Sequence, residues 1–161
     1  MNLKTDLAEN LAGNKSGNIV IWGENYATGI PLIDDQHREL VNLTNNLYRA
    51  CLTGTAAVDT AFKEAMSRMV VYVRFHFTAE LELLKKLDYP KFDEHKLQHD
   101  TLIRDILAAA NEYKLGKLFI PHQFARTLRD WVFGHIAIYD KQYASYFNEK
   151  KKLLAGLQVE A

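Results

Sequence analysis

Two pairs of polar residues lie within the apolar stripes of two expected helices. His76 and Glu80 form the first pair, and His95 and His99 form the second. Residues four apart lie on the same face of a helix, about one turn from each other. Neighbouring apolar residues recur at the same three- and four-residue spacing, so all four polar side chains are predicted to face the interior. Burying them without partners costs roughly a few kcal/mol each, and a shared metal ion would satisfy them together.

Four long amphipathic segments with short connections are expected. Asp34 or Asp35 can cap the first helix, Pro90 stops the second, and Pro121 suits the first turn of the fourth. This pattern predicts an all-α, up-down-up-down four-helix bundle. The expected helices cover residues 34–53, 59–87, 92–114 and 121–150. On the fourth helix the inward stripe is expected to contain Phe124, Leu128, Trp131, His135, Ile138, Tyr139, Gln142 and Tyr146.

The regions outside the helices divide the chain into three parts. Residues 1–18 are polar and rich in small residues, which predicts a flexible leader. The bundle is expected over residues 19–150, and it begins with an N-terminal extended arm in which Trp22 and Tyr26 cover one end of the core. A C-terminal tail is expected over residues 151–161.

Charge and composition exclude several classes of partner. Lysine plus arginine and aspartate plus glutamate number 20 each, and the formal net charge is zero. Without a basic run, binding to nucleic acid or to an anionic membrane has no electrostatic support. No stretch approaches the roughly 18 apolar residues of a membrane span, and the leader lacks the apolar segment of a secretion signal. A soluble, cytoplasmic protein is predicted, with Cys51 as a small buried hydrophobe.

Five of the six histidines fall on predicted inward faces, and they come from all four helices. A single buried histidine is usually a hydrogen-bonded core residue, but this many on one interior favours a metal site. His122 is the exception and is expected on the surface. Seven ligands exceed the four of a tetrahedral zinc and suit two metals that share bridging carboxylates. The candidate ligands are His37, His76, Glu80, His95, His99, His135 and Asp140.

The spacing of these residues resembles one family over roughly residues 22–147. The segments that carry the likeness are Trp22, Gly29-Ile30, Ile33-Asp34-Asp35-Gln36-His37, His76-Phe77-x-x-Glu80, Tyr89-Pro90-x-x-x-x-His95-x-x-x-His99 and Trp131-x-x-x-His135-Ile136-x-x-x-Asp140-x-x-Tyr143. Together they resemble the hemerythrins, specifically bacteriohemerythrin-like proteins. The resemblance implies a non-heme centre of two iron ions (Fe2+/Fe3+) with an oxo or hydroxo bridge, and dioxygen as the ligand.

The resemblance also implies a role for each residue. His95, His99 and His135 would hold one iron, and His37 and His76 would hold the other, which keeps an open position for dioxygen. Glu80 and Asp140 would bridge the two irons. The walls of a dry oxygen pocket would be Leu40, Phe77, Trp131, Val132 and Ile136. Tyr143 could hydrogen-bond a bridging ligand, although an ordinary half-buried tyrosine is an equally good interpretation.

Two features of the sequence need comment beside the resemblance. Leu81 and Leu84 stand where the family often has Glu and Met, which affects the surroundings of the site rather than its ligands. The five-residue step from His135 to Asp140 turns about 140° on a regular α-helix. We therefore expect either a local π-type widening of the fourth helix or an Asp140 side chain that reaches in from the flank.

The role of dioxygen binding is left open between several interpretations. Reversible binding for transport or storage is preferred, without enzymatic activity, and sensing would require a protein partner that the sequence does not identify. The alternative is a di-iron enzyme acting on peroxide, nitric oxide or ferrous iron, which rapid decay of the oxygenated form would indicate. A structural bundle that holds zinc is a third interpretation, which elemental analysis would test.

Overall fold

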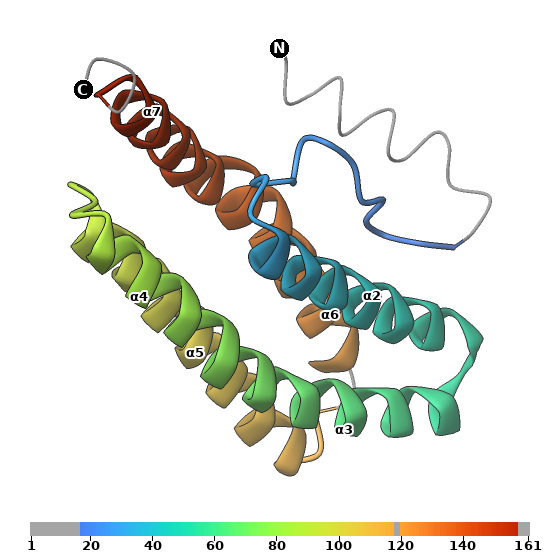
Figure 1. Cartoon of the computed structure of the whole chain (residues 1–161). Coiled ribbons are helices and arrows are strands. Elements are labelled where there is room, and N and C mark those ends of the chain that lie inside the picture. Colours follow the sequence, from blue (N-terminus) through green and yellow to red (C-terminus); the bar gives the residue numbers. More distant parts are fainter. Residues whose placement is uncertain (1–16, 118–119, 158–161) are drawn as a thin grey trace.

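The helices of the computed structural model form four long rods, which confirms the predicted all-α four-helix bundle (Figure 1). The structure describes residues 17–117 and 120–157, so most of the predicted leader and the end of the tail lie outside the described residues. The rods are α2 (Pro31–Thr53), then α3 (Thr55–Tyr72) with π-helix η1 (Val73–Phe77) and α4 (Thr78–Lys86), then α5 (Phe92–Lys114), and finally α6 (Ile120–Trp131) with π-helix η2 (Val132–Asp140) and α7 (Lys141–Leu157). The predicted domain bounds stay predictions.

Two helices begin earlier than the sequence predicts. α2 starts at Pro31 rather than at Asp34, because proline fits the first helical turn, where its missing N–H is not needed. The carboxylate of Asp34 instead accepts hydrogen bonds from Thr28 N, Thr28 Oγ1 and Gly29 N, at 2.6, 2.8 and 3.0 Å. α3 starts directly after Gly54, whose φ of 126° is a conformation that favours glycine. Asp34 therefore fastens the segment before the helix rather than capping it.

The π-helix η1 in the second rod was not predicted, but a four-residue repeat accounts for it. Tyr72, His76, Glu80 and Leu84 are all buried. Because an α-helix has 3.6 residues per turn, each four-residue step drifts by about 40°, and three steps carry a side chain about 120° off the core face. A wider turn at η1 absorbs this drift and keeps all four residues pointing inward.

The fourth rod shows the same effect over a longer stretch. Its buried residues recur every four positions and include Phe124, Leu128, Val132, Ile136, Asp140 and Ala144. The nine-residue η2 keeps this repeat in register, so the predicted widening between His135 and Asp140 is confirmed. The expected stripe is wrong at two positions after His135, since Ile138 is 38% exposed and Gln142 is also exposed, whereas Tyr139 and Tyr146 are partly buried. The prediction placed Ile138 and Gln142 inside because it assumed a regular α-helix there.

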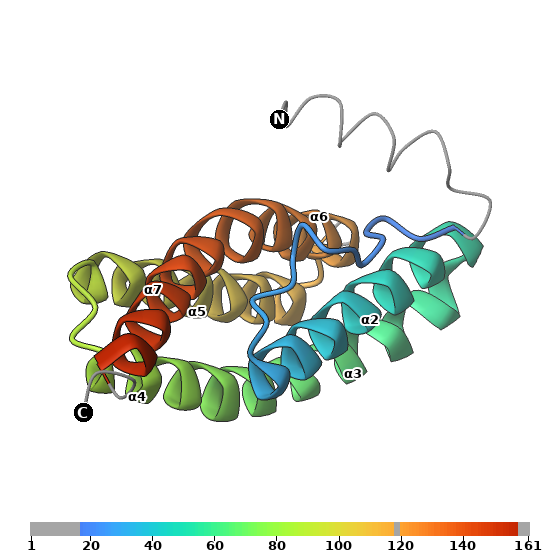
Figure 2. The same ribbon diagram turned by 45° about the horizontal axis from the view of Figure 1, so that its top comes forward.

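Residues 17–30 contain no helix or strand and cross the side of the bundle formed by α2 and the fourth rod (Figure 2). Asn45 on α2 accepts hydrogen bonds from Ile19 N and Val20 N at 2.9 and 3.0 Å, and its amide donates to Val20 O at 2.8 Å. On the other side, Lys141 Nζ donates to the backbone of residues 24 and 27. The segment is thus attached to the first and the last rods.

The core has a main and a smaller apolar cluster. The smaller one comprises Leu84, Tyr89, Tyr143 and Ala144.

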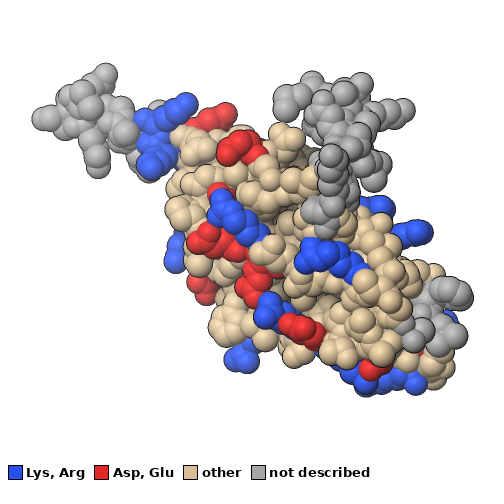
Figure 3. All heavy atoms as spheres, turned by 90° about the vertical axis from the view of Figure 1, so that its right-hand side faces the viewer, with Lys and Arg blue, Asp and Glu red and all other residues tan. Residues whose placement is uncertain are grey.

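None of the described helices is long and apolar enough to cross a membrane. On the face drawn in Figure 3, basic and acidic side chains are interspersed rather than segregated, in keeping with the zero net charge. His122 is exposed and Cys51 is buried, as the sequence predicts.

The contacts of Asn45 generate a testable prediction. Asn45→Ala removes three hydrogen bonds, two of them buried, and leaves the amides of Ile19 and Val20 without their acceptor, so we expect a loss of about 1–3 kcal/mol in the free energy of unfolding. Urea unfolding of the metal-free protein measures it. Asn42→Ala, at an exposed position on the same helix, is the control and should change stability by less than about 0.5 kcal/mol. Equal stability of the two variants would contradict the prediction.

Candidate metal centre

The structure brings all seven predicted ligand residues together in the interior, next to the main apolar cluster. None of their side chains has more than 3% of its surface exposed. All four rods contribute. The residues are His37 on α2, His76 on η1, Glu80 on α4, His95 and His99 on α5, and His135 and Asp140 on η2.

One group of potential ligand atoms gathers around Glu80. Its Oε2 lies 3.1 Å from His95 Nε2 and 2.9 Å from His99 Nε2. His99 Nε2 in turn lies 3.1 Å from His135 Nε2. One ligand atom from each of the four residues lies within 4.8 Å of the others, which is close enough for all four to bind one metal ion.

A second group combines His37, His76 and the same Glu80. His37 Nε2 and His76 Nε2 lie 3.3 Å apart, and His76 Nε2 lies 3.6 Å from Glu80 Oε2. These three residues also offer ligand atoms within 4.8 Å of one another. The two groups therefore share one carboxylate.

Asp140 makes a second connection between the two groups. Its Oδ2 lies 3.2 Å from His37 Nε2, while its Oδ1 lies 3.1 Å from His135 Nε2 and 3.7 Å from His95 Nε2. Each oxygen thus faces imidazoles of a different group. A carboxylate in this position can bridge two cations with one oxygen on each.

The donor set fits metal ions better than it fits hydrogen bonds. Two ligand atoms that each lie about 2.1 Å from a metal and at right angles to each other are about 3 Å apart, which is the spacing between these atoms. Both oxygens of Asp140 and one of Glu80 are buried without a hydrogen-bond partner among the described residues, although imidazole nitrogens lie close to them. Such orphaned acceptors are costly unless a cation satisfies them.

The surrounding imidazoles keep both carboxylates ionised in the metal-free protein. Burial alone would raise the pKa of Glu80, but the imidazoles of His76, His95 and His99 outweigh it and hold this pKa well below its usual range. The pKa of Asp140 falls to about 2, since His135 and His37 outweigh burial and the charge of Glu80. Both groups are therefore in the form that binds metal.

Burial acts in the opposite direction on the histidines. It lowers the pKa of His76 to about 3, against the attraction of Glu80 and Asp140, and it also lowers the pKa of His99. His95 differs, because its hydrogen bond and attraction to Glu80 outweigh burial and raise its pKa. His76 and His99 are thus neutral near pH 7, as metal ligation requires.

Aromatic and aliphatic side chains cover the imidazoles. Phe77 stacks on His99 with ring centroids 3.7 Å apart and an angle of 6° between the planes, and Trp131 stacks on His135 at 4.0 Å and 13°. The five predicted pocket residues all pack in or against the main apolar cluster, and they are Leu40, Phe77, Trp131, Val132 and Ile136. Four of the five are buried, and Trp131 is partly buried.

Two residues next to the centre were missed from the sequence. Gln36 Oε1 accepts a hydrogen bond of 2.9 Å from His76 Nδ1, and Tyr72 stacks on the His76 ring at 4.6 Å. Gln36 directly precedes His37, and Tyr72 comes four residues before His76, so position relative to the ligands could have indicated both. Tyr143 is fully buried rather than half-buried, and its ring lies 5.5 Å from that of His95.

Two phenols at the centre lack hydrogen-bond partners among the described side chains, those of Tyr72 and Tyr143. Burial, together with the charges of Glu80 and Asp140, raises the pKa of both phenols well above the usual value. Each hydroxyl therefore keeps its proton and can act as a hydrogen-bond donor.

Comparison with known proteins identifies the family. Residues 28–147 match the family described as the hemerythrin HHE cation binding domain. This chain belongs to the hemerythrin family. The matched region includes all seven clustered residues. The hemerythrin family binds non-heme iron, and the clustered histidines and Glu80 could hold a metal ion.

Several bacteriohemerythrins are similar to this hemerythrin over most of its length. The protein from Stenotrophomonas maltophilia is 29% identical over 126 residues, which cover 78% of this chain and 80% of the relative. Those from Methylococcus capsulatus and Aquifex aeolicus are 27% and 26% identical, each covering 73% of this chain and 88% of the relative. None of these names denotes an enzyme, in agreement with the prediction of a non-enzymatic protein.

The lowered pKa values predict how the metal-free protein responds to acid. His76, with a folded-state pKa of about 3, stays neutral in the folded state throughout this range, and burial makes the folded state take up a proton on His99 at lower pH than the unfolded state, whereas both take up protons below about pH 6.5 in the unfolded state. We therefore expect stability to fall as the pH drops from about 6.5 to 4.5, by about 1.4 kcal/mol per pH unit for each such proton. His95, whose pKa is raised, adds no slope in this window, because it is protonated in both states there.

Thermal or urea unfolding at a series of pH values measures this slope. His76→Gln should reduce it by about one proton, while His122→Gln, at an exposed position, should leave it unchanged. Glu80 and Asp140 act in a lower window, below about pH 4.5, because their pKa values are depressed in the folded state. A wild-type stability that is flat between pH 6.5 and 4.5 would contradict the prediction.

Proposed function

We propose that this hemerythrin binds two iron ions in the interior centre and uses them to bind dioxygen reversibly. The observation that carries the proposal is the sharing of carboxylates. Glu80 belongs to both groups of potential ligands, and Asp140 faces imidazoles of both groups with separate oxygens. Two cations held by bridging carboxylates use this arrangement fully, whereas a single tetrahedral zinc would leave three of the seven groups without a role.

The proposed ligand roles follow the two groups. His95, His99 and His135 hold one iron, and His37 and His76 hold the other. Glu80 and Asp140 bridge them, with an oxo or hydroxo group completing the pair. The iron with two histidines has fewer protein ligands and therefore keeps a position open for dioxygen.

The chemistry of the donor set favours iron that stays available for reversible binding. When bound, the pair of irons supplies two electrons that dioxygen takes up on binding and returns on release. Five imidazoles suit iron among several metals. Only two carboxylates contribute negative charge, fewer than in bundle sites that carry a Glu-x-x-His motif on two helices. Less negative charge at the site favours the reduced state of the metals.

The apolar walls serve to keep water from the open position. Leu40, Phe77, Val132 and Ile136 have at most 4% of their surface exposed, and Trp131 covers the ring of His135. Water or a proton that reached the bound ligand would release it and leave the centre oxidised. A dry pocket thus supports reversible binding over oxidative turnover.

The phenol of Tyr143 is placed to donate a hydrogen bond to a bridging ligand. It is fully buried, keeps its proton and lies beside Glu80, whose charge adds to burial in raising the pKa of the phenol. Tyr72 offers a second such donor beside His76. A donated hydrogen bond stabilises negative charge on an oxygen ligand without transferring the proton.

The physiological role that we propose is transport or storage of dioxygen in the cytoplasm. Sensing would require a protein partner. The proposal names dioxygen as the ligand and involves no nucleic acid.

An absorption experiment tests the proposed function. The metal-free protein is loaded with ferrous iron without oxygen, and elemental analysis should give two irons per chain. Exposure to air should produce new bands that disappear on purging with argon and return on re-exposure. Bands that decay rapidly with product formation, when peroxide or nitric oxide is supplied, would instead indicate the enzymatic alternative. Preferential retention of zinc would indicate a structural site.

Replacement of one ligand should remove iron and its contribution to stability together. His135→Ala takes away a residue that lies 3.1 Å from both His99 and Asp140, so we expect it to lose at least one iron per chain. Iron present at about 1,000 times its dissociation constant stabilises the wild-type protein by about 4 kcal/mol, and most of this gain should vanish. His122→Ala, at an exposed histidine, is the matched control. Unchanged iron content in His135→Ala would refute the ligand assignment.

A further inference from the structure

The two halves of the centre repeat one arrangement of residues. In the first half, His37 on α2 lies 3.3 Å from His76 on the following rod, measured between Nε2 atoms. In the second half, His99 on α5 lies 3.1 Å from His135 on the rod that follows it. A glutamine directly precedes the first histidine of each pair, Gln36 in one half and Gln98 in the other.

In the first half this glutamine has a defined function. The Nε2 atom of His76 faces the other ligands, so the ring hydrogen resides on Nδ1, and Nδ1 donates to Gln36 Oε1 at 2.9 Å. Such a hydrogen bond fixes the tautomer and the orientation of a ligand imidazole and makes it a stronger donor to the metal.

In the second half the corresponding hydrogen bond is absent. His135 Nε2 lies 3.1 Å from Asp140 Oδ1 and 3.1 Å from His99 Nε2, and once Nε2 binds iron the ring hydrogen must reside on Nδ1. His135 Nδ1 is buried and has no partner among the described residues. Trp131 and Tyr139 stack on the ring at 4.0 and 5.8 Å, but neither contact satisfies the N–H group. A buried donor without an acceptor is unusual in a folded protein.

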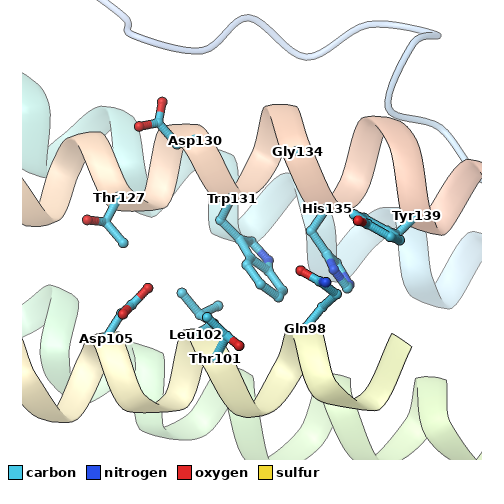
Figure 4. Close-up of a pocket in the computed structure, with 10 residues that line it drawn as sticks. All are labelled: Gln98, Thr101, Leu102, Asp105, Thr127, Asp130, Trp131, Gly134, His135 and Tyr139. Atoms are coloured by element: carbon cyan, nitrogen blue, oxygen red, sulfur yellow. The ribbon is translucent and has the colours of Figure 1, made fainter. Parts of the chain in front are cut away.

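Gln98 and His135 line the same pocket, between α5 and the fourth rod. Figure 4 shows the Gln98 side chain rising from α5 towards the His135 ring. The pocket has a volume of about 360 Å³, so the partly buried Gln98 side chain has room to turn. Asp130 is paired with Arg129, and the Thr101 hydroxyl donates to Leu97 O. Asp105 and Thr127 lie at the end of the pocket away from His135 (Figure 4).

We propose that Gln98 is the positioning residue of His135, and that its amide oxygen accepts the hydrogen bond from His135 Nδ1 as Gln36 does from His76. The inference rests on the proposed function, since it concerns an imidazole that holds iron. Gln98 does not touch the metal. Gln98 acts through the His135 ring. Trp131 and Tyr139 stack on this ring and hold its plane, and the hydrogen bond to Gln98 fixes how the ring is turned within that plane.

Release of iron to a chelator tests the inference. Each variant is loaded with ferrous iron without oxygen, a ferrous chelator is added, and the loss of iron is followed by absorbance. Gln98→Leu has a similar shape but no acceptor, so we expect it to lose iron from one half of the centre about 10- to 100-fold faster than the wild type. Gln98→Glu keeps an acceptor and should release iron no faster than the wild type.

Two controls separate positioning from general damage. Thr127→Ala changes the same pocket and should release iron at the wild-type rate. The melting temperature of metal-free Gln98→Leu should differ from that of the wild type by no more than the melting temperature of metal-free Thr127→Ala does. The faster release of iron would then come from the metal-bound state and not from a less stable fold. Gln36→Leu should accelerate loss from the other half, and the double variant should accelerate both.

The outcomes are distinct. If the wild type holds two irons and Gln98→Leu releases them at the wild-type rate, the role of Gln98 is overturned and the proposed function stands. Equal acceleration in Gln98→Leu and Thr127→Ala, or in Gln98→Leu and Gln98→Glu, also overturns it. A wild-type protein that holds no iron removes the proposed function itself.

Discussion

The structure depends on the burial of two ionised carboxylates among five imidazoles. Isolated, each carboxylate would be far too costly to bury, but Glu80 and Asp140 each face several imidazole nitrogens at about 3 Å and remain charged. Their pairing with imidazoles offsets only part of that cost, because several oxygens and ring nitrogens still lack partners. A centre built in this way could be completed by cations.

The geometry of the rods follows from that requirement. Ligand pairs four residues apart, such as His76 and Glu80, must remain in line with apolar residues above and below them. A regular α-helix has 3.6 residues per turn, so residues spaced by four drift off one face. The wider turns of the two π-helices hold more residues per turn and bring these side chains back to the core face. The longer of them also aligns His135 with Asp140, five positions later. The backbone is therefore irregular at the centre, where the ligands require it.

The sequence predicted the architecture and the members of the centre for a physical reason. Histidines within apolar stripes are rare enough that their spacing identified both the faces and the residues. The sequence predicted burial and helix type less well where the backbone departs from a regular α-helix. For this reason Ile138 and Gln142 were placed inside and η1 was missed. Pairings between rods, such as Gln36 with His76, depend on helix rotation, which one sequence does not specify.

The segment over residues 17–30 has a consequence for the order in which a new chain matures. It is synthesised first, yet its backbone is held in part by Lys141, near the end of the last rod. His135 and Asp140 likewise leave the ribosome after the other five ligands. A nascent chain therefore exposes an incomplete set of donors until its final third emerges, and closure of this segment follows the emergence of that final third.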